Sequence, residues 1–374
     1  MAKRPTIVVD PFLVLASALA AAVGVVMVYT ATRGELLLVG ASPTYYLKRQ
    51  AVFVVLGIVV MGGVGLFDYR RLEQFGMVIY GVTIAALLAV MVPHVGSHTL
   101  GSTRWFSFGP LQIQPSEFAV LGLVVAVATY CTRRQDGLTW RDVVKLLVMG
   151  GVPIGLVMIQ PDLGTGIVMS VVLLVMLAVA GLPTRVLVIL LVGAVCVVAL
   201  VIAAGLLKHY QILRITSFLH QSTTHLSPTL QNAVYNLQQA KDAIGAGGLF
   251  GTGLNHGFAT TLGYVPEQQT DFIFTAVGEQ LGFVGAVGVL AVLGFVAWRV
   301  LRAAQLARDD FGRLVCMGVF TFIAFSTFQN AGMTMGLMPI TGIPLPFISY
   351  GGTAVLAFFT GVGLALSVYA RRAG

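Results

Sequence analysis

The chain has 374 residues, of which 57% are hydrophobic and only 10% are charged. Soluble domains carry about 25% charged residues, so this composition excludes an ordinary soluble protein and indicates an integral membrane protein. The formal net charge of +8 requires no nucleic-acid partner, because basic residues beside membrane spans contact anionic lipid headgroups.

Apolar stretches of about 20 residues, long enough to cross a bilayer, recur along the whole chain. They predict an all-α polytopic membrane protein with about ten transmembrane helices in a single integral membrane domain, residues 1–374. The expected spans lie near residues 12–31, 50–67, 75–93, 116–131, 143–159, 165–181, 185–207, 271–299, 312–332 and 351–370. No small-residue cleavage pattern follows the first span, which we therefore expect to stay in the mature protein.

The cations are divided unequally between the two sides of these spans. Fifteen of the 22 lysines and arginines fall on the side that holds both termini. The other side has seven: Arg33, Lys48, Arg49, Arg104, Lys208, Arg214 and Lys241. The positive-inside rule therefore predicts a protein of the bacterial cytoplasmic (inner) membrane with both termini in the cytoplasm.

The three cysteines, Cys131, Cys196 and Cys316, lie inside spans or near their cytoplasmic ends. None lies in a long external segment, so we expect neither a disulfide nor a cysteine-based metal site.

Three long polar segments lie on the external side, at residues 94–117, 207–271 and 333–350. The second is the large extracytoplasmic loop between spans seven and eight. Loops of this length are usually functional, and non-helical backbone at membrane depth must be buried in protein or line a wet cavity. We expect a polar cavity that opens outward, with the active site on this extracytoplasmic side.

Three acids at the membrane boundary are candidates for function, because ionisable groups are costly there. Asp271 opens the helix that begins DFIF, and Asp162 stands between spans five and six; each has the plain alternative of capping a helix N-terminus. Glu117 lies in the first turn of span four, where an acid simply complements the helix dipole. Their spacing alone does not decide between these alternatives.

The glycine-rich run GAGGLFGTGLNHG at 245–257 lacks the GK[ST] ending of a nucleotide-binding loop, so we expect turns or close helix contacts instead. The six histidines show no HExxH or similar spacing, which argues against a histidine-based metal centre.

Five blocks of sequence, in order, resemble motifs of the SEDS family (shape, elongation, division, sporulation). The run PEQQTDFIFTAVGEQLG at 266–282 is similar to the family's PExxTDFIFxxxxEELG segment. The other four are GSTRWFSFGPLQIQPSE at 101–117, QPDLGT at 160–165, IGAGGLFGTG at 244–253 and NAGMTMGLMPITGIPLPFISYGGT at 330–353. The compact length, short termini and QPDLGT wording resemble RodA more than FtsW; sporulation paralogues such as SpoVE stay open.

This resemblance implies a ten-span peptidoglycan glycosyltransferase that polymerises lipid II on the outer face of the cytoplasmic membrane, for cell elongation and rod shape. It implies a class B penicillin-binding protein (transpeptidase) as partner. Asp271 matches the family's essential acid, and the positions matching other cavity-lining motif residues are Glu117, Asp162, Arg104, Trp105 and Gln114. Two motif cations are replaced here, by Val120 and Gln112, so their roles do not carry over.

Chemically, Asp271 is the best candidate for the general base that deprotonates an attacking sugar hydroxyl. A neighbouring acid, Glu267 or Asp162, would raise its basicity. The departing pyrophosphate needs positive charge, for which Arg104, Arg214 and Arg49, with Lys48, are on the correct side. A divalent cation, Mg²⁺ or Mn²⁺, held by Asp271, Glu117 or Asp162 is a further hypothesis; no cofactor is required with certainty.

Two other functions stay open at this point. A ten-span bundle with acids in a central cavity is also compatible with a lipid II flippase, although the polar residues thin out toward the cytoplasmic side. A scaffold that only positions its partner is the second alternative.

Overall fold

The computed structural model describes residues 9–92, 96–99, 102–109, 111–134, 137–203, 205, 209–219 and 228–372. Within them, ten long helices stand where the ten spans were expected. They are α1 (Pro11–Leu38), α2 (Tyr45–Leu66), α3 (Tyr69–Ala89), α4 (Pro115–Thr132), α5 (Trp140–Ile159), α6 (Leu163–Val179), α7 (Thr184–Ala203), α11 (Ile273–Gln305), α12 (Asp310–Thr334) and α13 (Gly352–Ala370).

Eight of these helices are long and apolar enough by themselves to cross a membrane. The other two, α6 and α7, are apolar helices whose qualifying stretches are slightly shorter. The polytopic, predominantly helical fold is therefore confirmed.

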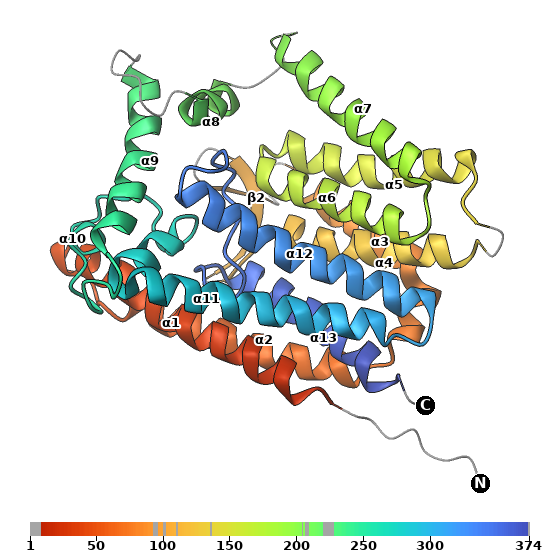
Figure 1. Cartoon of the computed structure of the whole chain (residues 1–374), viewed down its shortest axis with the longest axis horizontal. Helices are drawn as coiled ribbons and strands as arrows, with labels where there is room; N and C mark the ends of the chain where they lie inside the picture. The colour runs from red at the N-terminus through yellow and green to blue at the C-terminus, as the bar shows by residue number, and fades with distance from the viewer. Residues whose placement is uncertain are drawn as a thin grey trace.

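The ten helices pack into one bundle in which α4 and α13 are central and mostly buried. The start of α1 and the end of α13 lie near each other at one end, away from α9 and α10 (Figure 1). We call this end, which carries the joints at 67–68, 133–139, 180–183 and 306–309, the basic end. The opposite end, with the joints at 39–44, 90–114, 160–162, 204–272 and 335–351, is the loop end. Lys3, Arg4 and Lys208 lie outside the described residues.

The 207–271 segment is more structured than the expected loop. It contains α8 (His209–Leu219), α9 (Pro228–Ala246) and the short α10 (Phe258–Thr261), whereas residues 207–208 and 220–227 lie outside the described part. Figure 1 shows α9 and α10 at the loop end, where α10 packs beside the last turns of α1.

A small antiparallel sheet at the loop end was not predicted. It has the order β1 (Ser97–Thr99), β2 (Ser102–Phe108) and β3 (Leu111–Ile113), with Phe106 opposite Ile113. Hydropathy over span-length windows misses strands this short, although the alternation in STRWFSF is typical of a strand.

Helices α2 and α3 make no packing contact with each other in the described part, although they are consecutive in sequence. Between them lies an apolar groove of about 700 Å³, floored by α4 and α13. Val64 of α2 and Val82 of α3 line its sides, and Phe106 and Ile113 of the sheet line its end. The groove therefore runs along the bundle and reaches the loop end beside the sheet.

Candidate active site

The segment before α11 holds Asp271 in a tight turn built around one carbonyl. The Glu267 backbone, with φ +52°, places its C=O where it accepts the amides of Thr270 (3.2 Å), Asp271 (3.1 Å) and Phe272 (3.4 Å). Helix α11 begins at Ile273 after Phe272, without any side-chain cap. The alternative reading of Asp271 as an N-cap is thus wrong, and its carboxylate is free for another use.

Charged groups of both signs surround the partly buried Asp271 carboxyl. Burial raises its pKa to about 6, with Glu267 and Asp162 acting in the same direction and Arg214 and Arg104 opposing. Three of these four groups, Asp162, Arg214 and Arg104, come from segments distant in sequence, so the fold assembles the cluster. A carboxyl with such a pKa is ionised at neutral pH yet a stronger base than an exposed aspartate.

Gly342 lies against the carboxylate of Asp271. The Gly342 φ is +74°, and a Cβ there would lie 3.0 Å from Asp271 Oδ2 and 3.7 Å from Arg214 Nη2. Arg214 also donates from Nη1 to the Thr341 carbonyl, at 3.0 Å. The 341–342 backbone therefore brings the arginine of α8 to the acid before α11, and only glycine fits at 342.

Asn330, in α12, is a positioning residue that was not singled out from the sequence. Its fully buried Nδ2 donates to the Asp271 carbonyl (2.8 Å) and to the Ile343 carbonyl (2.7 Å). One amide thus ties the Asp271 turn to the loop that contains Gly342. The residue lies in the quoted block 330–353, but nothing in its local sequence indicates those two partners.

Asp162 caps a helix, which was the plain alternative considered for it, and its second carboxylate oxygen has other partners. Oδ1 accepts the Thr165 amide at 3.2 Å and so caps α6. Oδ2 accepts from Gln114 Nε2 and from Ser116 Oγ, each at 2.9 Å. The cap is real, and the second oxygen joins the start of α4 to the start of α6.

Arg104 and Trp105 lie on β2, above these helix starts. Arg104 Nη2 donates to the Pro161 carbonyl, while its buried Nε has no hydrogen-bond partner. Its guanidinium carbon is 6.0 Å from the centre of the Trp105 ring. An unsatisfied guanidinium N–H is costly when buried, so this arginine is suited to receive an anionic ligand.

Glu117 lies in the first turn of α4, as expected, and its side chain is buried. It is within electrostatic range of both Asp162 and Asp271. The structure therefore places three of the predicted acids in one cluster. Among the described residues, however, no group of three or more His, Cys, Asp or Glu side chains could share an ion; the divalent-cation hypothesis stays a prediction.

The two remaining predicted residues, Glu267 and Arg49, are at least partly exposed. Glu267 has its carboxylate 3.3 Å from Thr270 Oγ1. Arg49 stacks its guanidinium over Tyr45 of the same helix, 4.7 Å from the ring centre, and is not among the groups that act on Asp271.

Glu279 is fully buried in α11 and has a structural role. Its carboxylate accepts the amides of Ala259 (2.8 Å) and Thr260 (2.9 Å) and the Thr260 hydroxyl (2.5 Å). Thr260 in turn accepts from Gln268 Nε2 at 3.1 Å. Glu279 thus fastens α10 to α11 and, through Gln268, supports the Asp271 turn.

Comparison with known proteins identifies the family. The family model described as "Cell cycle protein", covering FtsW, RodA and SpoVE, matches residues 11–373. The chain belongs to this family. This confirms the resemblance that was first noted in the five sequence blocks.

Several relatives cover nearly the whole chain. Stage V sporulation protein E of Bacillus subtilis is 35% identical over 96% of both chains. A probable peptidoglycan glycosyltransferase FtsW of Trichlorobacter lovleyi is 33% identical over 93% of this chain and 89% of its own.

Solved structures of the FtsW/RodA/SpoVE family share the fold. A chain from a structure on coordination of polymerization and crosslinking by a peptidoglycan synthase complex matches with a TM-score of 0.80, at 30% identity over 97% of this chain and 98% of its own. The rod shape determining protein RodA of Thermus thermophilus matches with a TM-score of 0.70, at 29% identity over 98% of both chains. Sporulation, division and rod-shape proteins are all similar to the chain, so the preference for RodA stays a prediction.

Proposed function

We propose that this chain is an inverting peptidoglycan glycosyltransferase that polymerises lipid II, with Asp271 as the general base. The observation that carries the proposal is the Asp271 carboxylate, which is free of helix capping and lies beside Arg214 in a cluster with Arg104, Asp162 and Glu117. The names of FtsW relatives as probable peptidoglycan glycosyltransferases support the same reaction.

In the proposed step, the 4-hydroxyl of an acceptor GlcNAc attacks the anomeric carbon of a donor sugar. The new C–O bond forms as the bond to undecaprenyl pyrophosphate breaks, and the hydroxyl proton passes to Asp271. A positioned base of this kind contributes about 10²–10⁴-fold to the rate. The α-linked donor becomes a β-linked product, since a single displacement inverts the centre.

The leaving pyrophosphate carries the charge that must be stabilised. Arg214 faces the Asp271 side of the cluster, and Arg104 offers a buried N–H that has no partner. Guanidinium groups bind phosphate oxygens in pairs of hydrogen bonds. We assign these two arginines to the pyrophosphate and Gln114 and Trp105 to the walls of the same cavity.

The prenyl chain needs an apolar site continuous with the membrane. The groove between α2 and α3 provides one, since its lining is apolar and its end at Phe106 and Ile113 lies on the sheet that carries Arg104. The lipid tail can stay in this groove while the sugars react at the loop end.

The cation distribution supports an orientation with the basic end in the cytoplasm and the active site outside the cytoplasmic membrane. The ion pairs of Arg299 with Asp10 and of Arg371 with Asp68, together with three others, are at the basic end. A flippase needs a polar route through this end as well, whereas here the charged groups bind one another.

A class B penicillin-binding protein is the proposed partner. The similar chain that comes from a peptidoglycan synthase complex supports this pairing. The QPDLGT segment and the likeness to RodA support elongation as the cellular role. The cellular role is tested by complementation. We expect expression of this chain to restore growth of cells depleted of their own RodA but not of cells depleted of FtsW; the reverse result would assign a division role.

The reaction itself is tested in liposomes that contain the purified protein, with its partner, and labelled lipid II. We expect glycan chains on sizing gels and no movement of lipid II between leaflets when polymerisation is prevented by a 4-deoxy acceptor sugar. Transbilayer movement without polymer would show a transporter. Glycan synthesis by the partner that is unaffected by loss of the acids would show a scaffold.

A further inference from the structure

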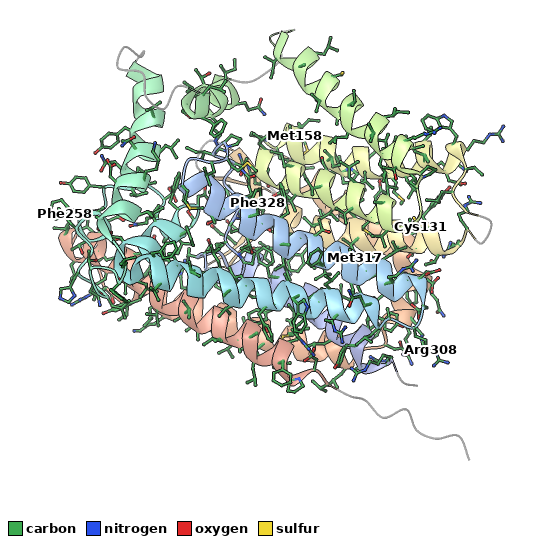
Figure 2. The ribbon with its side chains drawn as sticks, in the orientation of Figure 1. Cys131, Met158, Phe258, Arg308, Met317 and Phe328 are labelled. Carbon is green, nitrogen blue, oxygen red and sulfur yellow. The ribbon has the colours of Figure 1, made fainter. Side chains whose placement is uncertain are left out.

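A set of large apolar side chains is exposed at the loop end, where polar residues would be expected. Phe250 is 81% exposed and Phe258 is 68% exposed. We define the 249–264 patch as the exposed side chains Leu249, Phe250, Leu254, Phe258, Leu262 and Tyr264. Figure 2 shows Phe258 pointing outward at the edge of the molecule, at the opposite end from Arg308.

The position of the patch along the membrane normal follows from α11. Trp298 and the ion pair of Arg299 with Asp10 mark the interface at the basic end, since tryptophan and basic residues gather there. A hydrocarbon core about 30 Å thick takes about 20 helical residues at 1.5 Å each. Counting from Arg299 along α11, the far boundary of the core lies near Glu279.

Residues 248–253 lie at that boundary, because they are hydrogen-bonded to α11 there. Helix α11 is interrupted at Gly282, which has φ +67°. The freed amide of Phe283 donates to the Gly248 carbonyl (2.9 Å) and that of Val284 to the Leu249 carbonyl (3.1 Å). The loop end of the bundle therefore holds Leu249 and Phe250 at the depth of residues 279–284.

The backbone of this loop is paired as a membrane environment requires. Thr252 donates its amide to the Glu279 carbonyl (3.0 Å) and Gly253 to the Gln280 carbonyl (3.1 Å). The loop and α11 approach so closely that glycine is needed in both of them, at 251 and at 282. A Cβ on Gly282 would lie 2.2 Å from the Gly251 nitrogen. The glycine-rich run at 245–257 is thus a close contact with α11, as predicted, and its apolar side chains are left pointing outward.

Helix α10 gives an independent estimate of depth. A Cβ on Gly34 of α1 would lie 2.1 Å from the Thr261 carbonyl, so α10 is at the level of Gly34. Gly34 is 24 residues beyond Asp10, or about 36 Å along the helix. This level is about 6 Å above the core, inside the headgroup layer, where Phe258 and Tyr264 stack at 5.6 Å.

The patch is also continuous with a surface that faces lipid. Phe283, Val284 and Val287 on α11 are exposed and apolar, and the first two are bonded directly to the loop that carries Leu249 and Phe250. Apolar area therefore extends without interruption from the membrane-facing side of α11 into the patch.

We propose that the 249–264 patch is an interfacial membrane anchor, with Leu249 and Phe250 in the acyl region and Phe258, Leu262 and Tyr264 among the headgroups of the leaflet at the loop end. The occupant of this surface is the bilayer itself. The inference does not depend on the reaction that the protein catalyses. It does bear on the active site, since Glu279 joins the anchored loop and α10 to the Asp271 turn.

The test is a spin label placed at position 250 by Phe250→Cys, in a background with Cys131, Cys196 and Cys316 replaced by alanine, in liposomes without any partner. Label at Val284→Cys is the lipid-facing control, and label at Ser42→Cys, which is exposed in the 39–44 joint, is the aqueous control. We expect oxygen to enhance the relaxation of the label at position 250 as much as that of the label at position 284. We also expect the label at position 250 to be protected from a water-soluble nickel chelate. Nickel accessibility like that at position 42 would overturn the anchor, and protection from both reagents would overturn it in favour of a protein partner or second copy.

A second measurement avoids changing the cysteines. Phe250→Trp adds a fourth tryptophan to Trp105, Trp140 and Trp298. The additional emission should be quenched at least twofold by lipids brominated on the acyl chain and not by aqueous iodide. Quenching of the additional emission by iodide alone would contradict the proposal.

Discussion

Asp271 is held by its backbone, which leaves its side chain available. The Glu267 carbonyl, the Asn330 amide and the turn before α11 fix the residue through its N–H and C=O, while the carboxyl lies against Gly342 and Arg214. Burial and neighbouring acids raise its pKa to about 6, against the pull of two arginines. The same desolvation that makes it a better base makes its ionised form costly to the fold.

The rate of polymerisation should therefore follow the ionisation of Asp271. The base must be deprotonated, so kcat/KM should rise about tenfold per pH unit below 6 and level off above about 7. Initial rates on lipid II between pH 4.5 and 8 measure this profile. A rate that is constant or falls across that range would contradict the assignment.

Replacing Asp271 should separate stability from activity. An acid whose folded pKa is raised contributes stability that is fully present below its unfolded pKa and is lost as the pH rises through the folded value. At pH 7.5, Asp271→Asn removes the buried charge and should raise the unfolding temperature by about 2 °C or more. Differential scanning fluorimetry at pH 7.5 and pH 4.5 measures the unfolding temperatures of the wild type and the variant. The increase caused by Asp271→Asn should be smaller at the lower pH.

Asn330 should act through position rather than chemistry. Asn330→Ala leaves two buried carbonyls without a donor, which costs about 1–3 kcal/mol each, and lets the Asp271 turn separate from the Gly342 loop. We expect at least a tenfold fall in kcat with little change in KM. The pH profile should keep its shape, and Asn330→Gln should restore part of the rate. A normal kcat for Asn330→Ala would contradict this positioning role.

At the scale of elements, the active site depends on short segments that long helices hold in place. Helix α10 has only four residues and is fixed by the buried carboxylate of Glu279. The break at Gly282 allows α11 to accept the 248–253 loop. Both segments are therefore hydrogen-bonded to α11.

Glu279→Ala should therefore release α10 without touching the catalytic groups directly. Three hydrogen bonds to a carboxylate are lost, at roughly 1.5–3 kcal/mol for each charged bond before relaxation. Hydrogen exchange should become at least tenfold faster across 257–271 and unchanged in α4 and α13. Glu279→Gln keeps one acceptor oxygen and is the matched variant, with an intermediate effect expected. Unchanged exchange in 257–271 would refute the clamp.

At the scale of the molecule, the two ends of the bundle differ in kind. The basic end is closed by ion pairs and aromatic contacts such as those around Arg299, whereas the loop end holds the cluster of charged groups around Asp271. The apolar groove runs along α2 and α3 to the sheet that carries Arg104. This asymmetry matches a reaction that takes place at one face.

Asp10→Ala tests the closed end. Asp10 is fully buried, accepts from Arg299 Nε (2.9 Å) and Nη2 (2.6 Å), and caps α1. Breaking a buried pair costs about 3–5 kcal/mol, so the unfolding temperature should fall by several degrees. Polymerisation per folded molecule should stay near normal, and lipid II should still not cross the bilayer. Transport by this variant would revive the flippase hypothesis.

The sequence predicted the spans well because hydropathy is a property of each segment alone, and every one of the ten helices stands at its expected place. It also placed Asp271, Glu117 and Asp162 correctly at helix starts. It did not show that Asp162 caps a helix whereas Asp271 does not. The difference arises because Phe272 takes the cap position of α11 and the Glu267 carbonyl holds the backbone of the preceding turn. The roles of Asn330 and Glu279, and the separation of α2 from α3, depend on contacts between distant segments that a single sequence does not contain.

The most direct test of the central claim is glycan synthesis by Asp271→Asn in liposomes with lipid II and the partner protein. Asp242→Asn is the matched control, because Asp242 is an exposed acid on α9 that accepts a hydrogen bond from Gln238. Binding of lipid II is measured in parallel, so that lost chemistry is distinguished from lost affinity. We predict that Asp271→Asn binds lipid II but makes glycan at least 100-fold more slowly, whereas Asp242→Asn makes it normally. Glycan chains formed by Asp271→Asn at the wild-type rate would contradict the account.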